Sequence, residues 1–262
     1  ALVLGKALGV SSVGLIQAVA FLALAPLAGF GYMDINWLNL IIFLILFFPS
    51  IWVQRTMKKY NDPEDRYVIT GSDFARKLLD ALDLKDINVE ATEIGDHYDP
   101  IEKTVRLTED KMNSGSLTSI VVAAHEVGHA HQDATKYFPL SLRTKLVKIM
   151  APAQRVGAFI LMAAPFVTLI TRIPQSGLIM FLGGFLTLGM SSIIHLVTLP
   201  TEWDASFSRA MPMLESSNFL KEGDSDRARE ILRAAAFTYL AGSLMSLLNI
   251  ARWWTILRRG PL

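Results

Sequence analysis

The chain of 262 residues contains no cysteine. It can therefore form no disulfide and offers no thiolate to a metal, so any metal site must use histidine and carboxylate side chains. Positive and negative charges nearly cancel, with a formal net charge of +1, and this lack of a basic excess gives no indication of nucleic-acid binding. We find no internal repeat and no low-complexity tract.

Charge is also missing from long stretches of the chain. Hydrophobic residues make up 52% of the sequence, and uncharged stretches cover residues 7–33, 35–54, 156–171, 173–201 and 234–251. Apolar runs of about 20 residues are long enough to cross a bilayer, and tryptophans near both ends of the second stretch fit an aromatic belt. The first 30 residues lack the pattern of a cleaved signal peptide. We therefore expect a mainly α polytopic membrane protein with about five transmembrane helices.

The uncharged stretches suggest four regions. We expect an N-terminal transmembrane hairpin over residues 1–54, a water-exposed unit over 55–150 and a second hairpin over 151–200. Residues 201–262 would hold a further helix and a last membrane helix. Within the exposed unit, the apolar periodicity predicts a helix over 72–82, and residues 88–94 and 104–108 predict two short strands.

One motif carries chemistry. Residues 120–131 read IVVAAHEVGHAH, so His125 and His129 are four apart, with Glu126 directly after the first. Side chains at i and i+4 lie on the same face of a helix, where two imidazoles can hold one Zn²⁺. Zinc lowers the pKa of a bound water, and Glu126 can take the proton as that water attacks a carbonyl. The spacing therefore predicts a zinc metallopeptidase.

The surroundings of the motif favour this interpretation over a buried helix with two structural histidines. An apolar stretch leads into the motif, and Ser114, Gly115 and Ser116 supply a turn and a cap before it. Gly128 keeps bulk away from His129. His131 lies about 200° round the helix from His129, so we expect it at the surface or behind a ligand.

Several separated motifs resemble one family. They are Asp96-His97-Tyr98-Asp99-Pro100, Val105-Arg106-Leu107, the zinc motif from Ala123 to Ala130, Pro139-Leu140-x-Leu142-Arg143, and Leu196-Val197-Thr198-Leu199-Pro200-Thr201-Glu202. Their order and spacing resemble the bacterial membrane zinc metallopeptidases of the YugP type. The resemblance covers roughly residues 55–250.

This resemblance implies a small α+β gluzincin-like metallopeptidase unit. It places the third zinc ligand on a helix after the metal helix, where Glu202 matches. A carboxylate there would also be among the first charges that the chain meets on returning from the second hairpin. Asp204 lies about 200° away from Glu202 on a helix and is expected to form a cap with Thr201, whereas His195 would lie about 10 Å deeper.

The sequence therefore predicts a membrane-embedded zinc metalloendopeptidase. Zn²⁺ would be held by His125, His129 and Glu202, with Glu126 as general base and acid. Hydrolysis also needs hydrogen-bond donors aimed at the developing oxyanion, and His97, Tyr98 and Arg209 are candidates for that role or for a place behind the ligands.

Two alternatives remain from other classes. One is a catalytically silent zinc-binding scaffold that binds protein partners, but a structural zinc site has no need of Glu126. The other is a transporter or channel, for which the single candidate is His195 within an uncharged stretch.

The expected partners are a peptide or membrane-protein substrate and the lipid bilayer. Basic residues near the ends of the uncharged stretches predict that the segment 54–150 faces the cytoplasm, at the bacterial inner membrane.

Overall fold

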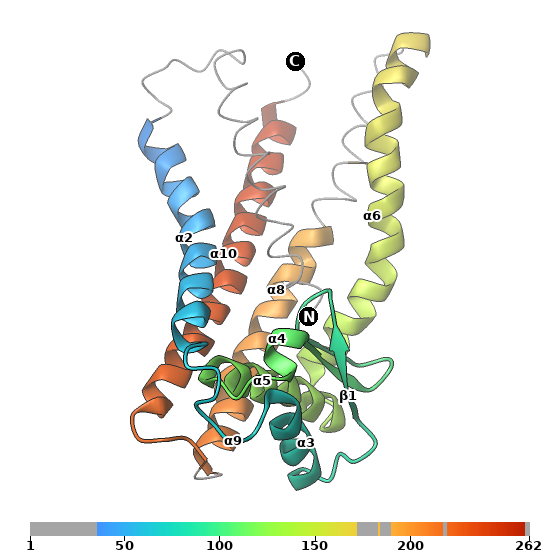
Figure 1. The fold of residues 1–262 in the computed structure, drawn as a ribbon. Coiled ribbons are helices and arrows are strands. Elements are labelled where there is room, and N and C mark those ends of the chain that lie inside the picture. The colour runs from blue at the N-terminus through green and yellow to red at the C-terminus, as the bar shows by residue number, and fades with distance from the viewer. Residues whose placement is uncertain (1–35, 172–182, 184–189, 217–218, 260–262) are drawn as a thin grey trace. The chain divides into compact units, whose positions relative to one another are not determined.

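The computed structural model describes residues 36–171, 183, 190–216 and 219–259 (Figure 1). Over these residues the protein is mainly helical. The chain divides into two compact units: Ala1–Thr135 with Trp203–Thr238, and Lys136–Glu202 with Tyr239–Leu262.

The first unit contains most of the shorter elements. These are α2 (Asn36–Tyr60), α3 (Gly71–Ala81), β1 (Asn88–Thr92), β2 (His97–Asp99), β3 (Thr104–Thr108), α4 (Glu109–Met112), α5 (Leu117–Ala134), the π-helix η3 (Asp204–Ala210), α9 (Met211–Ser216) and the start of α10 (Asp224–Arg259). The second unit contains α6 (Phe138–Thr171), most of α8 (Met190–Trp203) and the rest of α10.

Helix α5 lies at the centre of the first unit. Ser116 caps its first turn by accepting a hydrogen bond from the Ser119 amide. The helix packs against α3 and η3, and its apolar residues join a core with members from α3, β3, α9 and α10, including Phe74, Leu79, Leu107, Ile120, Leu214 and Ile231. Burying each such side chain contributes about 1.5–3 kcal/mol. The core thus fixes the helix that carries the zinc motif.

A small sheet lies beside this helix. Its strand order is β1-β3-β2, with β1 parallel and β2 antiparallel to β3. The predicted strands over 88–94 and 104–108 correspond to β1 and β3, and the predicted helix over 72–82 corresponds to α3, which Thr70 caps. Strand β2 was not expected. It pairs His97 with Arg106 and Tyr98 with Val105.

The predicted polytopic membrane fold is wrong for the part of the chain that the structure describes. The first expected span lies outside the described residues, as do residues 172–182 and 184–189. Across the rest, no helix combines enough length with enough apolar character to cross a bilayer. Helix α8 has only 14 residues, and the other long helices run into charged turns, such as Lys58 and Lys59 in α2 and Asp224 and Asp226 in α10. The uncharged stretches of the sequence therefore did not correctly predict transmembrane helices in these residues.

Candidate metal centre

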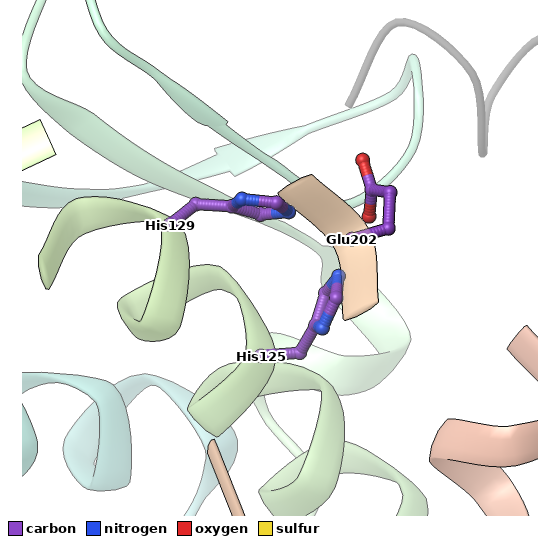
Figure 2. Close-up of side chains that lie close together, drawn as sticks. All are labelled: His125, His129 and Glu202. Atoms are coloured by element: carbon purple, nitrogen blue, oxygen red, sulfur yellow. The ribbon is translucent and has the colours of Figure 1, made fainter. Parts of the chain in front are cut away.

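The zinc motif lies in the middle of α5. His125 and His129 are one turn apart, both are buried, and their ring centroids are 4.8 Å apart. Both rings point to the same side of the helix (Figure 2). This follows from the four-residue spacing, which brings the two imidazoles onto one face.

Glu202 completes a group of three. It lies in the last turn of α8 and is 1% exposed. One ligand atom from each of His125, His129 and Glu202 lies within 4.8 Å of the others (Figure 2). Among the described residues this is the group that could hold a metal ion. Neither Asp204 nor His195 belongs to it.

Glu126 provides an independent observation that the site is built for more than packing. Its side chain is 1% exposed, and its Oε2 atom is buried without a hydrogen-bond partner in the described part of the protein. Leaving a buried polar atom unsatisfied costs about 1–3 kcal/mol, and more for a charged group. Two imidazoles and one carboxylate are the donor set of a catalytic zinc site, and a further carboxylate follows His125 directly in the sequence. The residues present therefore fit zinc.

Each histidine is oriented by a side chain for which the sequence did not predict this role. His125 Nδ1 lies 3.1 Å from the Ser206 hydroxyl on η3. His129 Nδ1 lies 3.0 Å from Gln132 Oε1, one turn further along α5. The spacing of three residues between His129 and Gln132 was the available signal, since such pairs meet on a helix surface. Ser206 could not be found in this way, because it comes from another part of the chain.

Arg143 holds the third residue of the group. Its guanidinium donates to Glu202 Oε1 at 2.9 Å, and both side chains are largely buried. Arg143 belongs to one of the family motifs, but the sequence analysis interpreted it only as a basic residue near an uncharged stretch. Pairing with a cation offsets part of the free-energy cost of burying a carboxylate.

Arg209 lies in the π-helix η3 and donates to Asp204 Oδ2 at 2.8 Å. Helix α8 continues through Pro200 and Thr201 and then widens into η3. Because no helix begins at Thr201, the predicted helix cap formed by Thr201 and Asp204 is wrong. A π-helix also changes the angle between successive side chains, so α-helical spacing no longer predicts which residues share a face.

The other candidate residues make hydrogen bonds of their own. His97 Nδ1 is 2.7 Å from the Gly95 carbonyl oxygen, and the Tyr98 hydroxyl donates to Asp133 at 2.7 Å. Burial, and then the bond to Asp133, raises the pKa of Tyr98, so its hydroxyl remains a donor over the whole working pH range. An oxyanion role for His97, Tyr98 or Arg209 stays a prediction.

Two further histidines lie outside the group of three. Burial, and then the positive charge of Arg143, lowers the pKa of His195. Burial, followed by Arg209, also lowers the pKa of His131, and Asp204 opposes this change. Both effects favour the neutral ring.

Comparison with known proteins agrees with the metal geometry. A family model described as "Putative neutral zinc metallopeptidase" matches residues 35–258. The chain is 34% identical over 217 residues to a protein of Bacillus subtilis (strain 168) named "Putative membrane protease YugP". That alignment covers 80% of this chain and 92% of the relative. No solved structure matches the chain.

Proposed function

The chain belongs to the YugP-type neutral zinc metallopeptidase family, as its motifs predicted, and from this premise we propose that it is a zinc metalloendopeptidase that hydrolyses peptide bonds. His125, His129 and Glu202 would hold the metal. The observation that carries the proposal is the buried group of three ligand side chains with the unpartnered Glu126 oxygen beside it in the sequence.

Bound zinc would supply a Lewis acid that polarises the peptide carbonyl and makes water acidic enough to lose a proton near neutral pH. Glu126 then has two tasks. Its carboxylate accepts the proton of the attacking water and later delivers it to the nitrogen of the leaving amine. The hydrogen bonds that His125, His129 and Glu202 make with Ser206, Gln132 and Arg143 hold the three ligand side chains in place before the reaction.

The decisive experiment compares the purified full chain with its Glu126→Gln variant. We expect the native chain to cleave a quenched fluorescent peptide library, to lose this activity with a chelator, and to regain it with Zn²⁺. The variant should bind zinc as the native chain does and cleave at least about 100-fold more slowly, because the substitution removes the base and leaves the ligands. Zinc binding without cleavage by the native chain would instead favour the scaffold alternative.

A place at a membrane is a separate part of the proposal. The relative is named a membrane protease, and large apolar side chains are exposed on α2 and α6, among them Phe48, Ile51, Ile149 and Phe159. We expect the chain to sediment with membranes. Recovery in the soluble fraction would contradict this. The cytoplasmic side of segment 54–150 stays a prediction, which labelling of a cysteine introduced at position 62 would test.

A further inference from the structure

A chain of hydrogen bonds runs from η3 to His129. Gln132 is fully buried on α5, with Oε1 3.0 Å from His129 Nδ1 and Nε2 donating to Asp204 Oδ2 at 2.8 Å. Arg209 donates to the same Asp204 oxygen, also at 2.8 Å. We call Arg209, Asp204 and Gln132 the relay. Both ends of the Gln132 amide are therefore used, and its orientation depends on a residue from a distant part of the sequence.

The donors and acceptors of the relay can be aligned in only one direction. The Asp204 carboxylate only accepts hydrogen bonds while it is ionised. Arg209, whose guanidinium is always charged, donates to this carboxylate and forms an ion pair with it. Asp204 therefore takes the amide N–H of Gln132, which turns the amide oxygen toward His129. That oxygen can only accept, so His129 Nδ1 must carry the proton.

A neutral imidazole with its proton on Nδ1 has its lone pair on Nε2. We propose that the relay is a positioning device that fixes the Nδ1-protonated form of His129 and so presents Nε2 to the metal. The proposal deepens the metallopeptidase function and rests on it for its zinc prediction. Gln132 acts through His129 and is a positioning residue.

The other histidine, His125, lies next to a hydroxyl from η3 instead of an amide. Ser206 lies 3.1 Å from His125 Nδ1, and a hydroxyl can either donate or accept. This bond orients the ring and leaves either nitrogen able to carry the proton. The relay therefore concerns His129 alone.

The test exchanges the polar groups of the relay. Asp204→Asn replaces one of the two acceptor oxygens with an N–H donor, so the neighbour of Gln132 can either accept or donate and no longer fixes the direction of the Gln132 amide. Gln132→Glu places a second carboxylate against Asp204. Each single variant should bind Zn²⁺ roughly 10- to 100-fold more weakly in competition with a chromophoric chelator. The double variant again has one carboxylate and one amide, now with the carboxylate facing His129. Its zinc affinity should return to within a few-fold of the native value.

If the relay contributed only to packing, the double variant would bind zinc at least as weakly as the weaker of the two single variants. That result would overturn the proposal. Asp226→Asn is the matched control, since it makes the same chemical change at an exposed residue of α10 and should leave zinc affinity unchanged.

A second measurement needs no variant of the relay. In the zinc-free native chain with ¹⁵N-labelled histidine, the His129 signals, assigned with His129→Gln, should show the proton on Nδ1. A proton on Nε2, or an even mixture, would overturn the proposal even if every relay variant failed to fold. Failure of the native chain to bind zinc would instead count against the metallopeptidase proposal, and the ¹⁵N result would still decide the direction of the relay.

Discussion

At the residue scale, the three candidate ligands are supported by three different kinds of group. A hydroxyl holds His125, an amide holds His129, and a guanidinium holds Glu202. Such supporting bonds orient a ligand before the metal arrives, which lowers the cost of binding. The ligands should therefore be much more sensitive to substitution than nearby polar residues.

Removing either histidine should abolish zinc binding. We expect about one Zn²⁺ per native chain and less than about a tenth of that after His125→Ala or His129→Ala, because catalytic zinc sites have only three protein ligands to lose. Elemental analysis of dialysed protein measures the occupancy. Full occupancy in both variants would mean that the metal is held elsewhere.

Glu202 should contribute far more to zinc affinity than His195, which lies on the same helix. Glu202→Ala removes a ligand and leaves the buried Arg143 without its carboxylate, so zinc affinity should fall by more than about 100-fold. His195→Ala changes a ring outside the group of three and should alter affinity by less than about threefold. Chelator competition on both variants checks this. Equal losses of zinc affinity in the two variants would mean that Glu202 is not the third ligand.

At the scale of the elements, the site depends on how closely η3 approaches α5. A Cβ placed on Gly128 would lie 2.7 Å from the carbonyl oxygen of Ala205. The sequence suggested that Gly128 keeps bulk away from the metal. The structure gives a different reason, because the glycine allows two backbones to touch. This contact brings Ser206 and Asp204 within reach of the side chains on α5.

Gly128→Ala should therefore destabilise the protein, even though alanine is the better helix former by about 1 kcal/mol. We expect a net loss of about 1–3 kcal/mol, as for overpacked cores, together with weaker zinc binding. Urea unfolding measures the loss. Gly242→Ala is the matched control on α10, where the added Cβ would lie 3.4 Å from the nearest atom and should be neutral or mildly stabilising. Similar effects of the two substitutions would contradict this account.

The elements that the sequence predicted well have strong local signals. Helix α5 has a capping serine and an apolar lead-in, and β3 alternates regularly, with its bounds at Thr104 and Thr108 as expected. Strand β2 has only three residues, too few to show alternation. The π-helix was missed because nothing in the sequence from Asp204 to Ala210 distinguishes it from an α-helix. Ser206 and Arg143 were missed as supporting residues because the ligands that they contact lie far away in sequence. Gln132 is only three residues from His129, but the partner that orients its amide, Asp204, is distant.

At the scale of the whole molecule, the first unit is assembled from two distant chain segments, Ala1–Thr135 and Trp203–Thr238. The metal helix belongs to one segment and the π-helix to the other. Besides the shared core, a polar cluster joins them. Asp224, at the start of α10, accepts hydrogen bonds from Arg66 at 2.6 and 2.7 Å and from the Tyr67 hydroxyl at 2.6 Å. The Asp224 side chain is fully buried.

This cluster should give the protein a recognisable loss of stability at alkaline pH. Burial, followed by the bond to Asp224, raises the pKa of Tyr67 to about 12, compared with about 10 in an unfolded chain. A group whose pKa is raised on folding contributes stability below its unfolded pKa and loses it as the pH rises through its folded pKa. Tyr67 should therefore contribute roughly 2–3 kcal/mol below pH 10, which disappears between about pH 10 and pH 12.

Tyr67→Phe isolates this contribution, because all other titrating groups remain in both proteins. At neutral pH the variant should be less stable by about 1–3 kcal/mol, since Asp224 loses a buried donor. As the pH rises from about 10 to about 12, the native chain should lose its advantage and the two urea-unfolding free energies should converge. If the unfolding free energies of the two proteins stayed parallel as the pH rises across this range, the titration of Tyr67 would not be coupled to folding. The joint between the two segments would then depend on the Arg66 pair and the apolar core.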